Sequence, residues 1–260
     1  MQNVMICPNC GKPLTPANGG KQLVCASGHS FDRAKEGYVN LMVGSRSGES
    51  RGDSRASALA RKEFLSRDYY GCLKRAIAAK MRGTVLDICC GEGYYDDYAG
   101  ALYGFDLSKE MVRLASRRHP EPNYHFFVAN LSSIPVADHS IDTAIHLFAP
   151  FHGEEFSRIL KGNGDLYSVI PGADHLYEMK QVVYDTPYKN DEQAPEVPQL
   201  RLLERETVTD RVTISQEDLK TCFSMTPYYY RTSESDRAKL DRVDEMELTV
   251  SFVLLHYRLP

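Results

Sequence analysis

The chain has 260 residues, of which 42% are hydrophobic and 25% charged, and its formal net charge is −4. This is the composition of a globular protein with one sizeable core and room for a small second domain, and it excludes a disordered chain. The sequence holds no run of eighteen apolar residues that would span a bilayer, and its first residues lack the pattern of a secretory signal. We therefore expect a cytoplasmic protein with no membrane contact.

Residues 1–44 contain a pattern of zinc ligands. Two residues separate Cys7 from Cys10, and after a further fourteen residues Cys25 and His29 follow with three residues between them. Thiolates and an imidazole at these spacings can close a tetrahedral structural site, and such short segments gain their folding free energy from the metal. The alternative, three unrelated buried cysteines and a surface histidine, is disfavoured by the paired spacing. We expect a small zinc-binding module in residues 1–44.

The charge is unevenly distributed along the chain. Residues 1–62 carry nine Lys and Arg against four Asp and Glu, a net charge of +5, which leaves −9 for residues 63–260. A basic N-terminal part on an acidic body predicts that the N-terminal part meets a polyanion. The alternative is that these cations form only a solvated surface. The cysteines outside the zinc pattern show no disulfide spacing, as suits a reducing compartment: Cys72, Cys89, Cys90 and Cys222.

Residues 45–80 are expected to link the module to the main domain. The stretch from Ser45 to Lys62 is poor in large apolar residues and rich in Ser, Gly and Arg, which predicts a mobile connector that stiffens into a helix near its end. From Ser57 to about Met81, apolar residues recur at helical intervals and predict one or two helices that lead into the main domain.

Residues 81–260 alternate between strand and helix patterns. Short apolar runs that predict strands occur at 84–90, 101–107, 124–131, 142–148 and 164–170. Helical patterns lie between them at 108–119 and 153–161. This alternation predicts an α/β fold with a parallel sheet and helices on both faces. After Pro198, segments at 207–215 and 245–260 alternate like antiparallel strands that close one edge of the sheet.

A glycine-containing turn follows the first of these strands. Asp87 ends the strand, and Gly91 and Gly93 allow the backbone to approach a ligand before a helix that we expect from about Tyr94. The turn lacks the third glycine of the dinucleotide-binding pattern. Asp96 stands there instead, and its charge would oppose a pyrophosphate at a helix N-terminus. A dinucleotide is therefore the weaker prediction.

Polar residues also follow the next two strands. Asp106 ends the second strand, where a carboxylate can accept hydrogen bonds from ribose hydroxyls, and Asn130 follows the third, where an amide can contact an adenine edge. Taken singly, Asp87, Asp106 and Asn130 could each be a turn or cap residue. Together they would line one crevice at the carboxyl ends of the strands, which resembles the S-adenosylmethionine-dependent methyltransferase fold. Tyr94 and Tyr95 could either pack in the core or flank the cofactor.

Several longer segments resemble one bacterial family, the large-subunit (23S) ribosomal RNA guanine-N1 methyltransferases. The matching segments are CPNC…CASGHSFDRAKEGYVNL, GDS, FLSRDYY, LDICCGEGYY, GFDLSK, APFHGEE, PGADHLYEMK and MTP. The resemblance covers the chain from Cys7 to about Pro227, and its most specific part is the segment from Phe31 to Leu41. It implies a zinc-binding module in front of a class I, Rossmann-like methyltransferase domain that methylates guanine N1 in a 23S rRNA hairpin. It also implies a homodimer.

The resemblance assigns roles to single residues. Cys7, Cys10, Cys25 and His29 fall on the zinc ligands of the family. Tyr70 and His175 fall on residues near the cofactor, which the sequence alone would leave as a helix-end aromatic and a loop histidine. With the strand-end residues, the expected set for binding S-adenosylmethionine is Tyr70, Asp87, Gly91, Glu92, Gly93, Asp106, Asn130 and His175.

The chain departs from the family pattern at three places. Cys89 replaces the first glycine of the cofactor loop, which is expected to weaken cofactor binding if the position needs a positive φ or a close contact. Only 13 residues separate Gly93 from Asp106, against about 20 in the general nucleotide-binding pattern, so the intervening helix should be short. The segment Lys161–Gly164 keeps turn-forming residues but lacks the usual proline.

The loop after the fourth strand is a candidate for binding the guanine. Phe151 could stack on the base, and His152 or Glu154 could accept the N1 proton. A surface position for His152 and a helix-capping role for Glu154 are the alternatives, so no catalytic base is assigned. The RNA phosphates would be held by the module and the connector arginines, through Lys12, Lys21, Arg33 and Lys35.

Two other functions remain open at this level. One is a small-molecule methyltransferase, in which the module would be a lid or a dimer contact. The other is an RNA-binding protein whose methyltransferase domain has decayed, which Cys89 and the short helix would explain.

Overall fold

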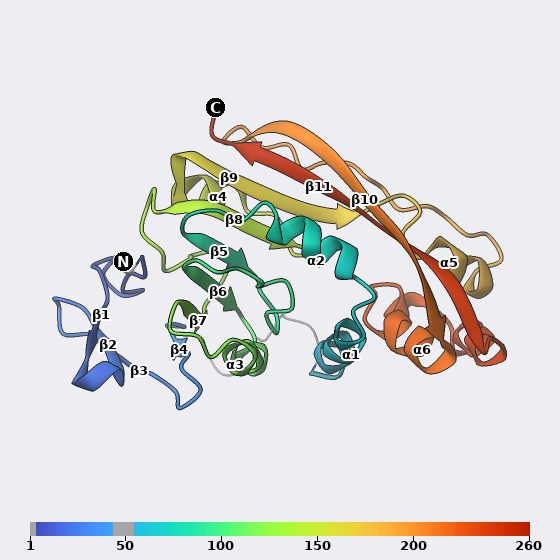
Figure 1. Cartoon of the computed structure of the whole chain (residues 1–260), viewed down its shortest axis with the longest axis horizontal. Helices are drawn as coiled ribbons and strands as arrows, with labels where there is room; N and C mark the ends of the chain where they lie inside the picture. The colour runs from blue at the N-terminus through green and yellow to red at the C-terminus, as the bar shows by residue number, and fades with distance from the viewer. Residues whose placement is uncertain (1–3, 44–54) are drawn as a thin grey trace.

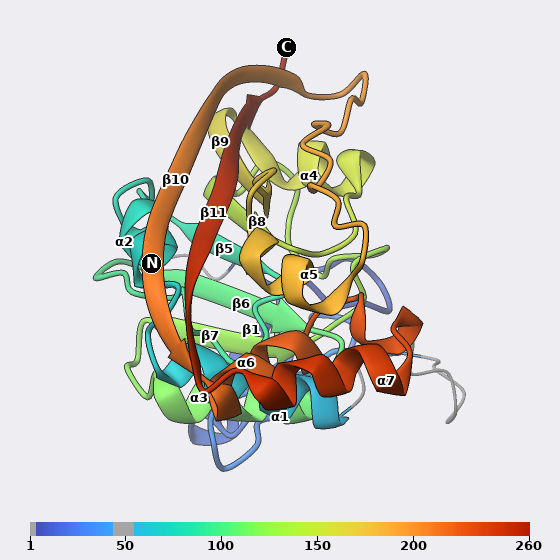
Figure 2. The same cartoon turned by 90° about the vertical axis from the view of Figure 1, so that its right-hand side faces the viewer.

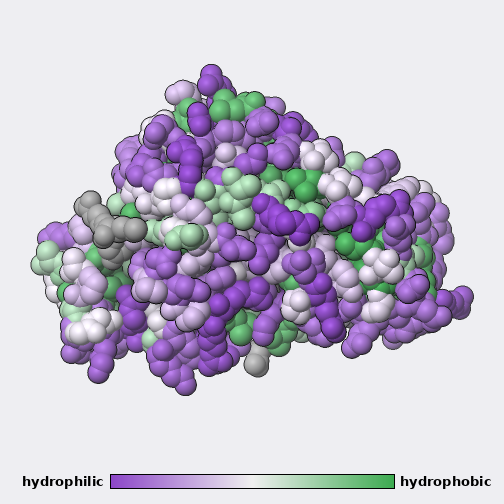
Figure 3. All heavy atoms as spheres, in the orientation of Figure 1, coloured by the Kyte–Doolittle hydropathy of each residue, from purple (hydrophilic) through white to green (hydrophobic). Residues whose placement is uncertain are grey.

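The computed structural model describes residues 4–43 and 55–260 (Figure 1). Residues 44–54 lie outside the described residues, and with them the connector arginines Arg46 and Arg51. On the face shown in Figure 3, hydrophilic residues predominate and apolar residues show in separate patches. Among the helices of the described residues, none combines the length and the apolar character needed to cross a membrane.

A mixed sheet of eight strands organises the molecule, in the order β10-β11-β9-β8-β5-β6-β7-β4. The strands from β4 to β9 are mutually parallel, whereas β11 runs antiparallel to both β9 and β10. Their bounds are β4 Val39–Asn40, β5 Val85–Ile88, β6 Leu102–Asp106, β7 Tyr124–Val128, β8 Ile141–Leu147, β9 Leu160–Pro171, β10 Arg201–Ser215 and β11 Glu245–Arg258. The predicted parallel sheet with an antiparallel edge is confirmed. Residues 161–164, expected as a turn, belong to β9, at a point where its register with β8 shifts.

Helices cover both faces of the sheet. They are α1 Arg55–Ser66, α2 Gly71–Ala78, α3 Lys109–Arg118, α4 Gly153–Ile159, α5 Tyr177–Val183, α6 Gln216–Ser224 and α7 Glu234–Arg237, with short 3-10 turns η2 Tyr229–Arg231 and η3 Ala238–Arg242. Side chains from α1, α2, α3, α5 and α6 share one apolar core, and α4 contributes to the core on the opposite face. The antiparallel pair of β10 and β11 is long and curved, and α6 follows directly at the end of β10 (Figure 2).

The N-terminal module, residues 4–43, packs onto the main sheet. Its own antiparallel sheet consists of β1 Thr15–Ala17, β2 Gln22–Val24 and β3 Ser30–Asp32, with η1 Asn18–Gly20 between the first two strands. Leu14 and Leu23 are fully buried in the same apolar core as Leu86 and Phe105 of the main sheet. The module also supplies β4, the edge strand that pairs with β7.

The prediction of a helix after Gly93 is wrong. Residues 94–101 form a turn followed by an irregular segment, and the chain then enters β6. Tyr94, Tyr95 and Asp96 are all buried. Consecutive helical residues point about 100° apart, so three successive buried side chains do not fit the apolar stripe of one short surface helix. Tyr94 and Tyr95 belong to the core and also line the cavity described below, which agrees with the first alternative left open for them and leaves the second, a contact with the cofactor, as a prediction.

Candidate functional site

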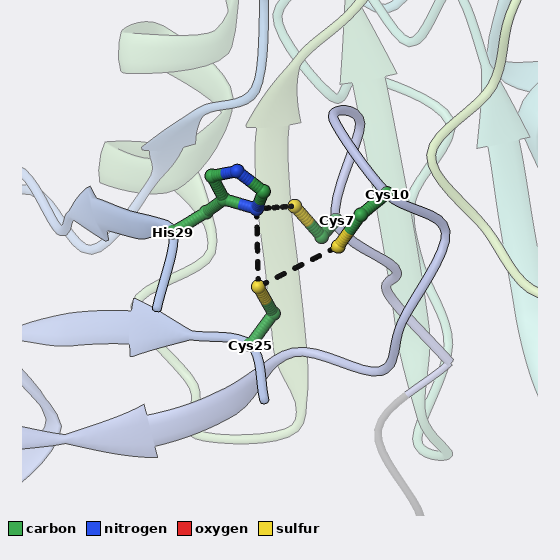
Figure 4. A group of neighbouring side chains, drawn as sticks. All are labelled: Cys7, Cys10, Cys25 and His29. Atoms are coloured by element: carbon green, nitrogen blue, oxygen red, sulfur yellow. Dashed lines mark hydrogen bonds between the residues drawn. The ribbon is translucent and has the colours of Figure 1, made fainter. Parts of the chain in front are cut away.

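The four predicted zinc ligands meet in one cluster (Figure 4). Nδ1 of His29 lies 3.4 Å from Sγ of Cys7 and 3.3 Å from Sγ of Cys25, and Sγ of Cys10 lies 3.7 Å from Sγ of Cys25. Metal–ligand bonds of about 2.3 Å to sulfur and about 2.0 Å to nitrogen put tetrahedral ligand atoms roughly 3.5–3.8 Å apart. The described side chains therefore fit a structural zinc ion.

Two tight turns aim these ligands at one another. Gly11, with φ of +69°, donates its N–H to the carbonyl of Cys7, and Gly28, with φ of +83°, donates to the carbonyl of Cys25. Glycine adopts such φ values without strain, which explains its place directly after Cys10 and directly before His29. The hydrogen bond from the Lys12 N–H lowers the pKa of Cys10 to about 6, which favours the thiolate that binds metal.

A cavity of about 900 Å³ opens at the carboxyl ends of the parallel strands. In open α/β sheets this is the edge where ligands bind. Seven of the eight residues predicted to bind cofactor line it, namely Tyr70, Asp87, Gly91, Glu92, Asp106, Asn130 and His175. Gly93 does not line it. A Cβ built on Gly93 would lie 3.1 Å from side-chain atoms of Asp96 and His119, so this position is directed toward those residues. The hollow is therefore open, and Asp106 faces it.

The turn after β5 has an unusual backbone. Cys89, Gly91 and Gly93 all have positive φ, at +61°, +55° and +73°. At Gly91 an added Cβ would have no neighbour within 4 Å, so it is the conformation and not a lack of space that favours glycine. Cys89 adopts the same region with a side chain, at a cost of about 1–3 kcal/mol. The condition under which this substitution was expected to matter, a positive φ, is met.

Asp106 and Asn130 each hold their own loop as well as facing the cavity. Oδ2 of Asp106 accepts the Gly91 N–H at 3.1 Å, and its Oδ1 accepts the Ser108 N–H at 2.8 Å. Oδ1 of Asn130 accepts the Ser132 N–H at 3.0 Å. The first of these bonds joins the turn after β5 to the end of β6, and the Ala129 N–H, which donates to the carbonyl of Asp106 at 3.1 Å, joins the end of β7 to the same wall. The structural and the functional roles weighed for these residues are thus compatible.

Three carboxyl groups are buried in or beneath the glycine turn. Neither oxygen of Asp87 and neither oxygen of Asp96 has a hydrogen-bond partner within residues 4–43 and 55–260. Burial, reinforced by the neighbouring Asp96, raises the pKa of Asp87 well above its usual range. Burial also raises the pKa of Asp96 to about 7, and that of Glu92 to about 7 although Arg118 lies 2.6 Å from it. From the sequence, we interpreted Asp96 only as a charge that opposes pyrophosphate binding, and its burial was not predicted.

Tyr70 and His175 form a buried pair on the cavity wall. The Ser251 N–H donates to Nδ1 of His175, so the hydrogen of the neutral ring is on Nε2, which lies 3.1 Å from the Tyr70 hydroxyl oxygen. Burial, together with the charge of Lys180, lowers the pKa of His175 to about 3. His175 therefore stays neutral, and both of its nitrogens are engaged.

The loop after β8 brings two of its three candidate residues to the cavity. Phe151, expected to stack on a base, lines the cavity, and its ring also packs against Phe156 at 5.0 Å and Tyr257 at 5.6 Å. Glu154 is exposed in the first turn of α4 and does not line the cavity, whereas His152 does. The sequence did not single out Phe148, which follows β8 directly and faces the cavity. Its position in the sequence, an aromatic residue directly after a predicted parallel strand, could have identified it as a candidate for lining the cavity.

Family models match both parts of the chain. The model "RlmA, N-terminal", a zinc ribbon, matches residues 5–44, and the model "Methyltransferase domain" matches residues 85–164. The first match covers the cysteine and histidine cluster, and the second covers the glycine turn, Asp106 and Asn130. Both agree with the geometry described above.

Three curated relatives are named as 23S rRNA guanine-N1 methyltransferases. A Micromonospora griseorubida protein named "Putative 23S rRNA (guanine-N(1)-)-methyltransferase" is 34% identical over 66% of this chain and 67% of its own length. A Bacillus subtilis protein of the same description is 27% identical over 96% of this chain and 95% of its own. The Streptomyces fradiae "23S rRNA (guanine(748)-N(1))-methyltransferase" is 34% identical over 66% of this chain and 65% of its own. The chain thus belongs to the 23S rRNA (guanine-N1)-methyltransferase family.

Proposed function

We propose that this chain transfers a methyl group from S-adenosylmethionine to N1 of a guanine in a 23S rRNA hairpin. The observation that carries the proposal is the cavity of about 900 Å³ at the carboxyl ends of the strands, in a chain of this family. A cavity of this size holds a cofactor and a nucleobase together. N1 lies on the Watson–Crick edge, so the target guanine must be unpaired or flipped out before it enters.

The buried acids of the glycine turn fit a cationic cofactor. The carboxyl of Asp87 lines the cavity, and an ammonium or sulfonium group beside it would favour the ionised form that burial disfavours in the free protein. Asp106 accepts one backbone N–H at each oxygen, and in this proposal the same carboxylate accepts the ribose hydroxyls. Asn130 is exposed and lines the cavity, and in this proposal it contacts the edge of the adenine. Gly91 and Glu92 contact the cofactor from the glycine turn.

The contribution of the protein to catalysis is mainly positional. The cofactor supplies an electrophilic methyl group on a positively charged sulfur. The neutral Tyr70–His175 pair and the buried turn at Cys90 and Tyr95 form a wall that excludes water from the cofactor side of the cavity. The rigid strand ends hold that wall, so binding places donor and acceptor at a fixed approach.

The N-terminal module is proposed to hold the RNA by its phosphates. Lys12, Lys21 and Lys35 are exposed on it and carry the positive charge outward. Arg33 has a structural role instead, because its guanidinium donates to the carbonyls of Gly20 at 3.0 Å and Gly37 at 2.6 Å. A homodimer, which the family resemblance implies, stays an expectation.

Methylation of a 23S rRNA transcript with labelled cofactor tests the proposal. We expect label to enter the RNA, and reverse transcription to stop at one guanine, because a methyl group on N1 blocks base pairing. A transcript with adenine at that position serves as the control and should accept no label. Label transferred only to small molecules would support the small-molecule alternative, and no detectable cofactor binding at millimolar concentration would support the decayed one.

A further inference from the structure

Phe148 is an exposed aromatic side chain at the mouth of the cavity. It follows β8 directly, 45% of it is exposed, and it lines the cavity. Its φ is +56°, in the left-handed region that a residue with a large side chain rarely adopts. Exposure of the ring and backbone strain both oppose folding, and strained residues of this kind cluster at ligand sites.

The surroundings of Phe148 leave one side of its ring available. Its N–H donates to the carbonyl of Val169 at 3.3 Å, which anchors the backbone to β9. The ring of Phe252 lies 5.8 Å away in a tilted arrangement. Phe148 is therefore held by its backbone and by one aromatic neighbour while the ring still reaches the cavity. Phe151, three residues later, is instead packed between Phe156 and Tyr257.

Three histidines line the cavity, and two of them cannot accept a proton from a substrate. His146 donates from Nε2 to the Pro150 carbonyl at 3.2 Å and accepts at Nδ1 from the Ser168 hydroxyl at 3.0 Å, while burial lowers its pKa to about 4. Both nitrogens of His175 are likewise engaged. His146 instead holds the Pro150 carbonyl and so shapes the loop between Phe148 and His152.

His152 differs from these two. Its Nδ1 is buried and has no hydrogen-bond partner within the described part of the chain. The residue stands just before α4, where Glu155 already pairs with Arg158 at 2.8 Å and accepts the Ile134 N–H at 2.7 Å. Because Nδ1 has no accessible surface, a ligand in the cavity can reach only Nε2 of this ring, which also has no hydrogen-bond partner within the described residues.

We propose that Phe148 stacks on the target guanine and that Nε2 of His152 accepts its N1 proton. This inference rests on the proposed function. The N1–H bond breaks and its proton passes to His152, and the electron pair left on N1 forms the bond to the methyl carbon. The bond between that carbon and sulfur breaks with its electrons kept by sulfur, which becomes a neutral thioether. Water then takes the proton from the imidazolium.

A fluorescent RNA tests the stacking half. The target guanine is replaced by 2-aminopurine, whose fluorescence is quenched when it stacks on an aromatic ring. We expect quenching with the wild-type protein and with Phe148→Tyr, loss of quenching with Phe148→Ala, and a fall of about tenfold to a hundredfold in RNA affinity for Phe148→Ala. Leu203→Ala, which also removes an exposed apolar side chain but lies outside the cavity, should behave as wild type. Full quenching with Phe148→Ala overturns this half.

Chemical rescue tests the proton acceptor. Single-turnover methylation by His152→Ala should be slower by about a hundredfold to ten-thousandfold, and added imidazole should restore part of the rate. Glu154→Gln should keep the wild-type rate, because Glu154 is exposed and outside the cavity. A wild-type rate for His152→Ala, or a loss that imidazole does not repair while folding and cofactor affinity stay normal, overturns the assignment.

The two proposals fail in different ways. Cofactor affinity, measured by calorimetry, should be the same in the wild type, Phe148→Ala and His152→Ala. If the wild-type protein methylates RNA and the variants match it, only the roles of Phe148 and His152 are overturned. If the wild-type protein binds cofactor but methylates no RNA guanine, the proposed function is overturned and these roles with it.

Discussion

The N–H of Leu41 donates a 2.9 Å hydrogen bond to the carbonyl of Val128, the last residue of β7. This bond continues the pairing of β4 with β7 and joins the N-terminal module to the strand that leads to Asn130. A second contact lies in the middle of the same loop, where the Ile6 N–H donates to the Pro135 carbonyl at 3.0 Å. The module therefore holds the segment that carries Asn130 on both sides of that residue.

Loss of zinc should loosen this loop and weaken cofactor binding. Cys10→Ser removes one ligand, and we expect faster hydrogen exchange in residues 129–137 and a severalfold higher Kd for the cofactor by calorimetry. Exchange in β5 and β6 should stay slow, which shows that the main sheet remains folded. Cys72→Ser, outside the cluster, is the matched control. Unchanged exchange in 129–137 after zinc loss would contradict the coupling.

The stability of the cofactor-free protein should fall as the pH rises from about 4 to 7. Burial raises the pKa of Asp96 to about 7, so the folded protein keeps a proton that the unfolded chain has released in this range. Each such proton lowers the free energy of unfolding by up to about 1.4 kcal/mol per pH unit. Asp96→Asn removes one of these protons and should make the slope in denaturant titrations shallower, while Asp87 and Glu92, whose pKa values burial also raises, keep theirs. The cationic cofactor, which favours the ionised acids, should bind more tightly with rising pH.

The neighbouring residue offers a control for this pH dependence. Asp97 is exposed and lies 3.9 Å from Lys74, so it lacks the burial that distinguishes Asp96. Asp97→Asn should therefore keep the wild-type slope. Equal slopes for Asp96→Asn and the wild type would show that the buried carboxyl does not hold the proton.

Relief of backbone strain at Cys89 should stabilise the protein. Cys89→Gly keeps the φ of +61° without its cost, and we expect a gain of about 1 kcal/mol in the free energy of unfolding and tighter cofactor binding. Cys89→Ala removes the thiol but keeps a Cβ, so it should bring no such gain. The result that would contradict the argument is the same gain for both variants, since that would assign the effect to the thiol.

The exposed lysines of the module should set the salt dependence of RNA binding. Replacement of Lys12, Lys21 and Lys35 by Gln should weaken binding and lower the slope of log affinity against log salt by up to about 3. Cofactor affinity should not change. Lys220→Gln, on α6 and paired with Asp241, is the control that should leave the slope intact. A slope equal to that of the wild type in the triple variant would place the phosphate contacts elsewhere.

Prediction from sequence worked where a local pattern has one physical solution. The spacing of Cys7, Cys10, Cys25 and His29 predicted a metal cluster, and the side chains do converge. Apolar runs of strand length predicted the parallel strands, because their residues are buried on both faces of the sheet. Asp106 was placed correctly at a strand end and faces the cavity.

Prediction failed where contacts distant in sequence decide. The expected helix after Gly93 does not form because Tyr94, Tyr95 and Asp96 are all drawn into the interior. Phe148 was not singled out, although it is an aromatic residue of the same loop as Phe151. Its exposure, and the packing of Phe156 and Tyr257 around Phe151, are seen only in the folded protein.

Local patterns were thus enough to specify the candidate metal ligands, the positions of the parallel strands along the chain and the polar residues at their ends. Ligand spacing and hydrophobic period act over only a few residues. The addition of β4 to the main sheet, the burial of Asp87 beside Asp96 and the exposure of the Phe148 ring were decided only in the folded protein. Each depends on which distant segments exclude water from a group, and that environment does not exist until the chain has packed.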